Sequence, residues 1–297
     1  MYKQIDSNKH KTIILMTLFL AFIIFLGWVI GKIYPEYGYG PLVMAVIISL
    51  VMTMVSYFAG DKVSLATAGA KGPIMANDNP YIYRLVENLC ITAGVPMPKI
   101  YIIPDQAMNA FATGRDPEHA SIALTQGIID RLENEELEGV IAHELSHIKN
   151  YDIRLMMIVV VLVGTISILS DYFLRSRWRK RDSSEGGGQA GTILMVVGII
   201  LIVLSPIIAE LIKLAISRKR EFLADADGAL LTRYPEGLAR ALEKISTDSD
   251  PLDRANTATA HLYISNPFGA KATSGFKKLF STHPPVAERI SQLRSMA

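Results

Sequence analysis

The sequence predicts an α+β fold in which a helical membrane part is joined to a soluble part of helices and short strands. Half of the 297 residues are hydrophobic, and long stretches of the chain carry almost no charge. Between these stretches the sequence is polar and alternates between helical and strand-like patterns. The average composition therefore combines two regions, one suited to lipid and one suited to water.

Four hydrophobic segments each have about the 20 residues that a helix needs to cross a bilayer. They cover approximately residues 12–30, 41–60, 153–173 and 191–212. No small-residue cleavage motif follows the first segment, so we expect an uncleaved signal anchor rather than a signal peptide. The pattern predicts a multi-pass protein of the cell membrane.

The charges beside the first segment predict the orientation of the chain. Lys3, Lys9 and Lys11 precede it, which favours a cytoplasmic N-terminus and, after two crossings, a cytoplasmic soluble part. The loop 175–191 conflicts with this rule, because it is basic and glycine-rich and would lie outside if the third and fourth segments both span. Either those segments form a re-entrant or peripheral hairpin, or the first helix fixes the topology. The sequence leaves both open.

These observations divide the chain into four parts. We expect a transmembrane hairpin in 1–60, a cytoplasmic catalytic part in 61–152, a second hydrophobic pair in 153–213 and a C-terminal catalytic part in 214–297. Within the soluble parts, hydrophobic periodicity and turn residues predict helices and short strands. The helices are expected at Pro80–Ala93, from an Asn134 N-cap to about Asn150, at Pro235–Ser246 and at Val286–Met296; the strands are expected at Lys99–Ile103, Met108–Thr113 and Ala120–Leu124.

The overall composition excludes several functional classes. The net charge of +2 is too small to indicate nucleic-acid binding, and we find no nucleic-acid motif. The single cysteine, Cys90, excludes a disulfide framework and argues against thiolate metal sites, and its apolar helical neighbours predict a buried side chain. A chain without disulfides is compatible with a reducing compartment.

The strongest chemical signal is the run from His143 to His147, which reads His-Glu-Leu-Ser-His. Two histidines four residues apart lie on one face of a helix and can bind one zinc ion. Glu144 lies beside them and can take a proton from a water molecule at the metal. The pattern predicts a zinc site that activates water for attack on a carbonyl group.

Zinc in such a site needs a third protein ligand, and this ligand must be distant in sequence. No histidine occurs six residues after His147, so the longer zinc-binding histidine pattern is absent. The best acidic candidate is Glu221, with Asp225 one helical turn later as an acceptor for a ring N–H of a histidine ligand. The same spacing also fits an ordinary solvated helix beside the membrane, and spacing alone does not choose.

These motifs resemble the M48 family of gluzincin metallopeptidases, and the resemblance covers nearly the whole chain. The resemblance rests on residues 109–114, 143–147, 221–225 and His283-Pro284-Pro285 with Arg289. The resemblance implies a zincin-like catalytic domain with one Zn²⁺ per chain. It also implies Glu221 as the third ligand, Asp225 as a supporting residue, and a role in membrane-protein quality control.

Further site residues follow from the resemblance. Asn109 and Ala110 would belong to an edge strand that pairs with the substrate backbone, although an ordinary sheet strand gives the same pattern. His283 would stabilise the oxyanion of the reaction and Arg289 would orient or assist it, although a helix-start histidine and a surface arginine remain possible.

Four functional hypotheses fit the sequence to different degrees. An endopeptidase acting on unfolded or membrane proteins at the bilayer is favoured. A substrate-specific processing protease, such as a prenyl-peptide processor, fits less well because that branch has more transmembrane helices. A zinc-stabilised scaffold does not explain Glu144 or a ligand set with an open position. A metal transporter would place ligands within the spans, whereas His143 and His147 precede the third segment.

Overall fold

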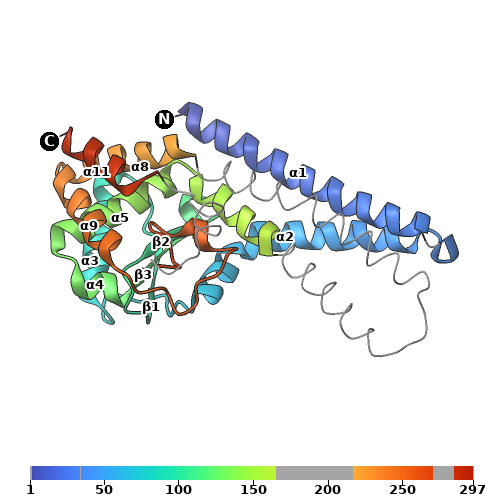
Figure 1. Cartoon of the computed structure of the whole chain (residues 1–297), viewed down its shortest axis with the longest axis horizontal. Coiled ribbons are helices and arrows are strands. Elements are labelled where there is room, and N and C mark those ends of the chain that lie inside the picture. The colour runs from blue at the N-terminus through green and yellow to red at the C-terminus, as the bar shows by residue number, and fades with distance from the viewer. Residues whose placement is uncertain (1, 34, 165–216, 270–283, 297) are drawn as a thin grey trace.

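A helical hairpin projects from a body of helices and strands in the computed structural model (Figure 1). The structure describes residues 2–33, 35–164, 217–269 and 284–296. The end of the third hydrophobic segment, the whole of the fourth, the basic loop and His283 lie outside the described residues.

The hairpin consists of α1 (Tyr2–Ile33) and α2 (Gly40–Ala68), joined through the short η1 (Pro35–Tyr37). The two helices pack closely at Gly27, where a Cβ atom would lie 2.8 Å from the carbonyl oxygen of Pro41. Helix α2 continues eight residues beyond the predicted end of its segment at Gly60. It does so because Leu65 and Ala68 pack into a core cluster of the soluble part.

Both hairpin helices present apolar surface that the protein itself does not cover. The most apolar windows of the spans Ile5–Lys32 and Gly40–Ala68 are only 22% and 17% buried, and their mean hydropathies are 2.9 and 2.3. Helices in the core of a soluble protein are mostly covered by neighbouring elements. Among the described residues these two helices are long and apolar enough to cross a membrane.

A three-stranded sheet forms one layer of the body, with the strand order β1-β3-β2. Strand β1 (Lys99–Ile103) is parallel to β3 (Ala120–Thr125), whereas β2 (Ala110–Gly114) is antiparallel to β3 and lies at an edge. The predicted second strand begins at Met108, but β2 begins at Ala110. The Met108 N–H donates to the Asp248 side chain at 2.8 Å and so leaves the sheet ladder.

Helix α5 is the centre of the body and contacts α3, α8, α9 and β2 (Figure 1). Its apolar face is fully buried in the main core, and the burial of each large side chain contributes about 1.5–3 kcal/mol. The helices of the body are α3 (Pro80–Ala93), α4 (Gln126–Arg131), α5 (Asn134–Lys149), α8 (Arg218–Thr232), α9 (Pro235–Thr247) and α11 (Val286–Arg294), with the short η2 (Pro117–His119) and η3 (Ala260–Leu262).

The start of α5 differs from the prediction by one residue. Glu133, rather than Asn134, is the N-cap, and its N–H donates to the Glu136 carboxylate at 2.9 Å. This reciprocal capping satisfies donors at the helix start that would otherwise lack partners. The Asn134 amide instead donates to Glu138 on the next turn.

A tight turn joins α5 directly to a further helix, which the structure describes over residues 152–164. Tyr151 in this turn has a φ of 60°, a left-handed conformation that is uncommon for a residue other than glycine. The following helix packs against the hairpin, with Leu155, Ile158 and Leu162 in the same cluster as Leu15 and Phe19 of α1. The active-site helix α5 is therefore followed directly by a helix that packs against the hairpin.

Candidate metal centre

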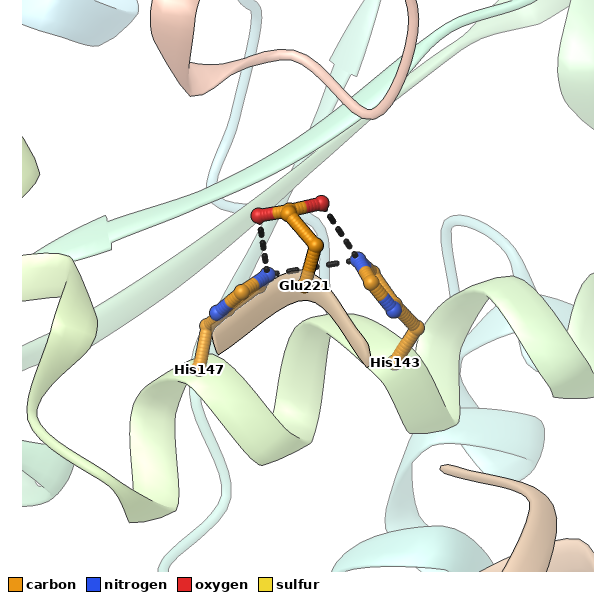
Figure 2. Close-up of side chains that lie close together, drawn as sticks. All are labelled: His143, His147 and Glu221. Atoms are coloured by element: carbon orange, nitrogen blue, oxygen red, sulfur yellow. Dashed lines mark hydrogen bonds and ion pairs between the residues drawn. The ribbon is translucent and has the colours of Figure 1, made fainter. Parts of the chain in front are cut away.

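His143 and His147 lie one turn apart on α5, and their side chains point to the same side of the helix (Figure 2). Both residues are buried. Their Nε2 atoms are 3.2 Å apart. Two ring nitrogens directed at one point in this way form the first half of a metal site.

Glu221 of α8 completes the group. Its Oε1 lies 3.6 Å from Nε2 of His147 and its Oε2 lies 3.8 Å from Nε2 of His143 (Figure 2). Two donors bound to one tetrahedral zinc at about 2.0–2.1 Å lie roughly 3.3 Å apart. The three buried donors, all within 4.8 Å of one another, therefore fit a single metal ion. The donor set of two imidazoles and one carboxylate leaves a position for a water or substrate oxygen.

Close packing between α5 and α8 brings Glu221 to the histidines. Gly228, about two turns after Glu221 on α8, faces the backbone of His143. A Cβ atom at Gly228 would lie 3.1 Å from the His143 nitrogen, closer than most side chains approach. The absence of a side chain at this position thus determines how near the carboxylate ligand comes to α5.

A buried ion pair holds His143. Its Nδ1 lies 3.0 Å from Oδ1 of Asp225, one turn after Glu221. Arg289 of α11 donates two hydrogen bonds to the Asp225 carboxylate, at 2.7 and 2.8 Å. Burial alone would raise the pKa of Asp225, but the Arg289 guanidinium holds this pKa at about 2. The ionised carboxylate beside Nδ1 of His143 favours the proton on that nitrogen and so leaves Nε2 to bind the metal.

A different carboxylate holds His147. Oδ2 of Asp152 lies 3.1 Å from Nδ1 of His147. Asp152 is buried at the start of the helix 152–164. Each histidine thus has its own carboxylate partner at Nδ1, and this arrangement fixes the ring tautomer that a metal site requires.

Glu144 lies between the metal ligands and strand β2. It is buried, and the backbone of Ala112 lies beside its carboxylate and lowers its pKa. Burial raises the pKa of Glu144, against the charges of the two histidines. A carboxylate with a raised pKa, next to the metal but not among its ligands, is suited to accept and return a proton.

The pairing of β2 explains why Ala112 faces the site. The Thr125 N–H donates to the Asn109 carbonyl, so Asn109 faces β3. Because antiparallel pairing alternates, Ala110, Ala112 and Gly114 direct their backbone groups to the free edge. This edge lies over α5, which contacts β2.

Two predicted substrate-binding residues are already engaged within the protein. Asn109 exchanges hydrogen bonds with the Ser265 backbone through its side chain. The Ala110 carbonyl accepts a hydrogen bond from the Ile264 N–H. Within the described residues, the Ala110 carbonyl therefore pairs with the segment at Ile264, and all five residues of β2 are buried.

The structure describes Arg289 but not His283. Arg289 is buried, and its hydrogen bonds join it to Asp225 and to the carbonyl oxygen of Ile264. Its expected partner His283 lies outside the described residues. Arg289 is thus part of the support for His143.

Sequence reasoning missed Asp152 and the Ala112 backbone. Asp152 follows His147 by five residues, so its proximity along the chain was a usable signal. The contact of Ala112 with Glu144 carried no signal, because a backbone donor is independent of residue type. It depends only on the register of β2 against β3.

A buried pair of histidines on one helix, a glutamate from a second helix and an adjacent unligated glutamate define a metallopeptidase of the His-Glu-x-x-His class. Here this site is joined to an apolar helical hairpin. Residues 76–297 match the model of Peptidase family M48, and the chain belongs to this family. The resemblance inferred from the motifs is confirmed, and the protein is a membrane metalloprotease.

Relatives with known names match over the whole chain. Proteins named Protease HtpX homolog from Dictyoglomus turgidum, Tropheryma whipplei and Streptococcus gordonii are 45%, 43% and 40% identical. The alignments cover 99%, 100% and 100% of this chain and 94%, 98% and 100% of the relatives. The crystal structure of S. mikatae Ste24p has a similar fold, with a TM-score of 0.53 and 20% identity over 99% of this chain and 67% of that chain.

Proposed function

We propose that this protein is a zinc-dependent endopeptidase of the cell membrane that degrades misfolded or damaged membrane proteins. The observation that carries the proposal is the convergence of three buried donors from α5 and α8 on one point, with Glu144 beside them. A role in stress response and quality control fits a site that reads backbone rather than side chains. The proteases named HtpX homologues support the same class of activity.

One Zn²⁺ per chain would be held by His143, His147 and Glu221. When bound, zinc polarises a peptide carbonyl and makes water a stronger acid. Glu144 takes the proton from the attacking water and transfers it to the leaving amine. His283, six residues before Arg289 in the sequence, is proposed to stabilise the oxyanion.

The substrate is proposed to bind as an added strand on the free edge of β2. Backbone groups at the Ala112 and Gly114 positions face this edge, and Asn109 and Ala110 set its beginning by holding the segment at Ile264. Pairing of this kind depends on main-chain hydrogen bonds and accepts many side chains. A broad substrate range, as degradation of unfolded chains requires, follows from it.

The active site is proposed to face the cytoplasm. The basic N-terminus favours a cytoplasmic start for α1, and α2 then returns the chain to that side. We propose that the chain crosses the membrane more than twice. In sequence order, the second hydrophobic pair in 153–213 separates the catalytic parts 61–152 and 214–297.

Cleavage of an unfolded protein by the full chain in detergent tests this function, with the Glu144→Gln variant measured in parallel. We expect the variant to hold one zinc per chain and to lose about 10²–10⁴-fold in rate, because only the proton acceptor is removed. Glu135→Gln, an exposed glutamate on the same helix, is the matched control and should cleave normally.

Zinc content separates the alternatives. Loss of cleavage with retained zinc in Glu144→Gln supports the protease. Zinc in both proteins without cleavage in either would favour the zinc-stabilised scaffold instead. Cleavage confined to one peptide class, with unfolded proteins left intact, would favour a substrate-specific processing protease.

A further inference from the structure

The first turns of α1 reach the end of the active-site helix. Asn8 is 1% exposed, although it lies close to the N-terminus on a helix whose outer face is open. Its side-chain amide donates to Oδ1 of Asp152 at 2.7 Å and to the carbonyl oxygen of Asn150 at 3.0 Å. These contacts join residues separated by more than 140 positions in the sequence.

Asp152 divides its two oxygens between different partners. Oδ2 faces Nδ1 of His147. Oδ1 accepts the hydrogen bond from Asn8 and lies 3.3 Å from a guanidinium nitrogen of Arg220, the residue before the ligand Glu221. Asn8 and Arg220 together therefore fix the plane of the carboxylate that orients His147.

Asn8 also supports the turn that positions Asp152. The carbonyl of Asn150, the C-cap of α5, has no later helical N–H to accept from, and the Asn8 amide fills this role. The ammonium group of Lys9 lies 4.8 Å from the ring centre of Tyr151, the residue with the left-handed φ. Two consecutive residues of α1 thus hold a turn whose conformation is uncommon.

We propose that Asn8 is a positioning residue of the metal centre, acting on His147 through Asp152. The inference rests on the proposed zinc function. It extends the metal centre beyond residues 76–297, which match the family model, to the N-terminal hairpin. In this arrangement the affinity for metal depends on how α1 sits against the body, so the membrane helix sets the strength of the site.

Zinc affinity of the full chain in detergent tests the proposal, measured by competition with a chelator of known affinity. We expect Asp152→Asn to weaken zinc binding about 10–100-fold, and Asn8→Ala about tenfold, since partners of metal ligands have effects of this size. The control is Thr12→Val, one turn along α1. Thr12 is equally buried and its hydroxyl has no hydrogen-bond partner within the described chain, so affinity should not change.

Two further readouts separate positioning from general structure. The visible spectrum of the Co²⁺-substituted protein should shift in Asn8→Ala and Asp152→Asn but not in Thr12→Val, because the His147 ring changes its angle to the metal. Excess zinc should restore cleavage in Asn8→Ala, whereas Glu144→Gln should remain inactive at any zinc concentration.

If Asn8→Ala binds zinc with wild-type affinity and has an unchanged cobalt spectrum, the proposal is overturned. This holds even if Asp152→Asn binds zinc weakly. Where Asn8→Ala does not fold, Asn8→Leu keeps the side-chain volume without the amide and is held to the same expectation. Failure of the wild type itself to bind zinc would refute the proposed function, and that result is distinct from normal binding in the Asn8 variants.

Discussion

The two histidines of the metal centre have the same kind of partner but depend on different parts of the chain. His143 is held by Asp225 and Arg289, both from the C-terminal part of the body. His147 is held by Asp152, which in turn is held from the N-terminal hairpin. One side of the site is thus internal to the soluble body, and the other side depends on a helix with lipid-facing character.

The difference shows two ways to hold a buried carboxylate that orients a histidine ligand. A bidentate guanidinium neutralises Asp225 directly within the core. Asp152 has a neutral amide donor at 2.7 Å and a more distant guanidinium at 3.3 Å. Because the second arrangement has less direct charge compensation, it should respond more to movement of its surroundings. Removing support from the two sides should therefore have unequal effects.

The largest effect is expected for Arg289→Met. The change leaves the Asp225 carboxylate buried without its charged partner, and loss of one member of a buried pair costs about 3–5 kcal/mol of unfolding free energy. Denaturant unfolding in detergent, followed by circular dichroism, measures it. Arg294→Met on the same helix removes only exposed ion pairs and should unfold nearly as the wild type does. Equal unfolding free energies for the two variants would contradict the view that Asp225 and Arg289 stabilise the His143 side from within the soluble body.

A smaller effect is expected for Gly228→Ala. The added methyl group would lie 3.1 Å from the His143 nitrogen, so α8 must move by a few tenths of an ångström and take Glu221 and Asp225 with it. Zinc affinity should fall about two- to fivefold, because a metal site tolerates displacements only below about 0.5 Å. Gly40→Ala, which places its methyl group in open space, is the control. An unchanged affinity in Gly228→Ala would show that the α5–α8 contact does not limit ligand geometry.

The smallest effect is expected at Cys90, which reports whether the body stays folded. Its burial raises the pKa of the thiol to about 12, so only about one molecule in 10⁴ carries a thiolate at pH 8. Labelling by a maleimide should be slow in the wild type and in Asn8→Ala, and fast only after unfolding. Rapid labelling of folded Asn8→Ala would mean that loss of the α1 contact disturbs the core, not the His147 side alone.

Local spacing predicted much of the site and the fold. His143, Glu144 and His147 belong to one helix, and helical periodicity fixes their common face. Every predicted helix and strand in the described soluble part is present, with ends that shift by a few residues. The expected burial of Cys90 is also confirmed.

Long-range side-chain pairing accounts for what the sequence did not predict. Asn8 occurs in a polar N-terminal stretch, and nothing local distinguishes it from its neighbours. Its role depends on where α1 crosses the end of α5, which is a property of packing. Asn109 was expected to belong to an edge strand that pairs with the substrate backbone. The contact of its side chain with Ser265, 156 residues later, depends on the fold and has no local signal in the sequence.

The buried charges around the metal ligands do not balance by themselves. Glu144, Asp152, Glu221 and Asp225 contribute four carboxylates, while the buried cations among the described residues nearby are the two guanidinium groups of Arg220 and Arg289. These carboxylates outnumber the two guanidinium groups, and burial raises the pKa of Glu144, so a proton on Glu144 offsets part of the negative charge when no cation is bound. A divalent cation held by the ligands supplies more of the missing positive charge than a monovalent one, so charge balance in a medium of low dielectric constant favours a divalent ion independently of ligand geometry.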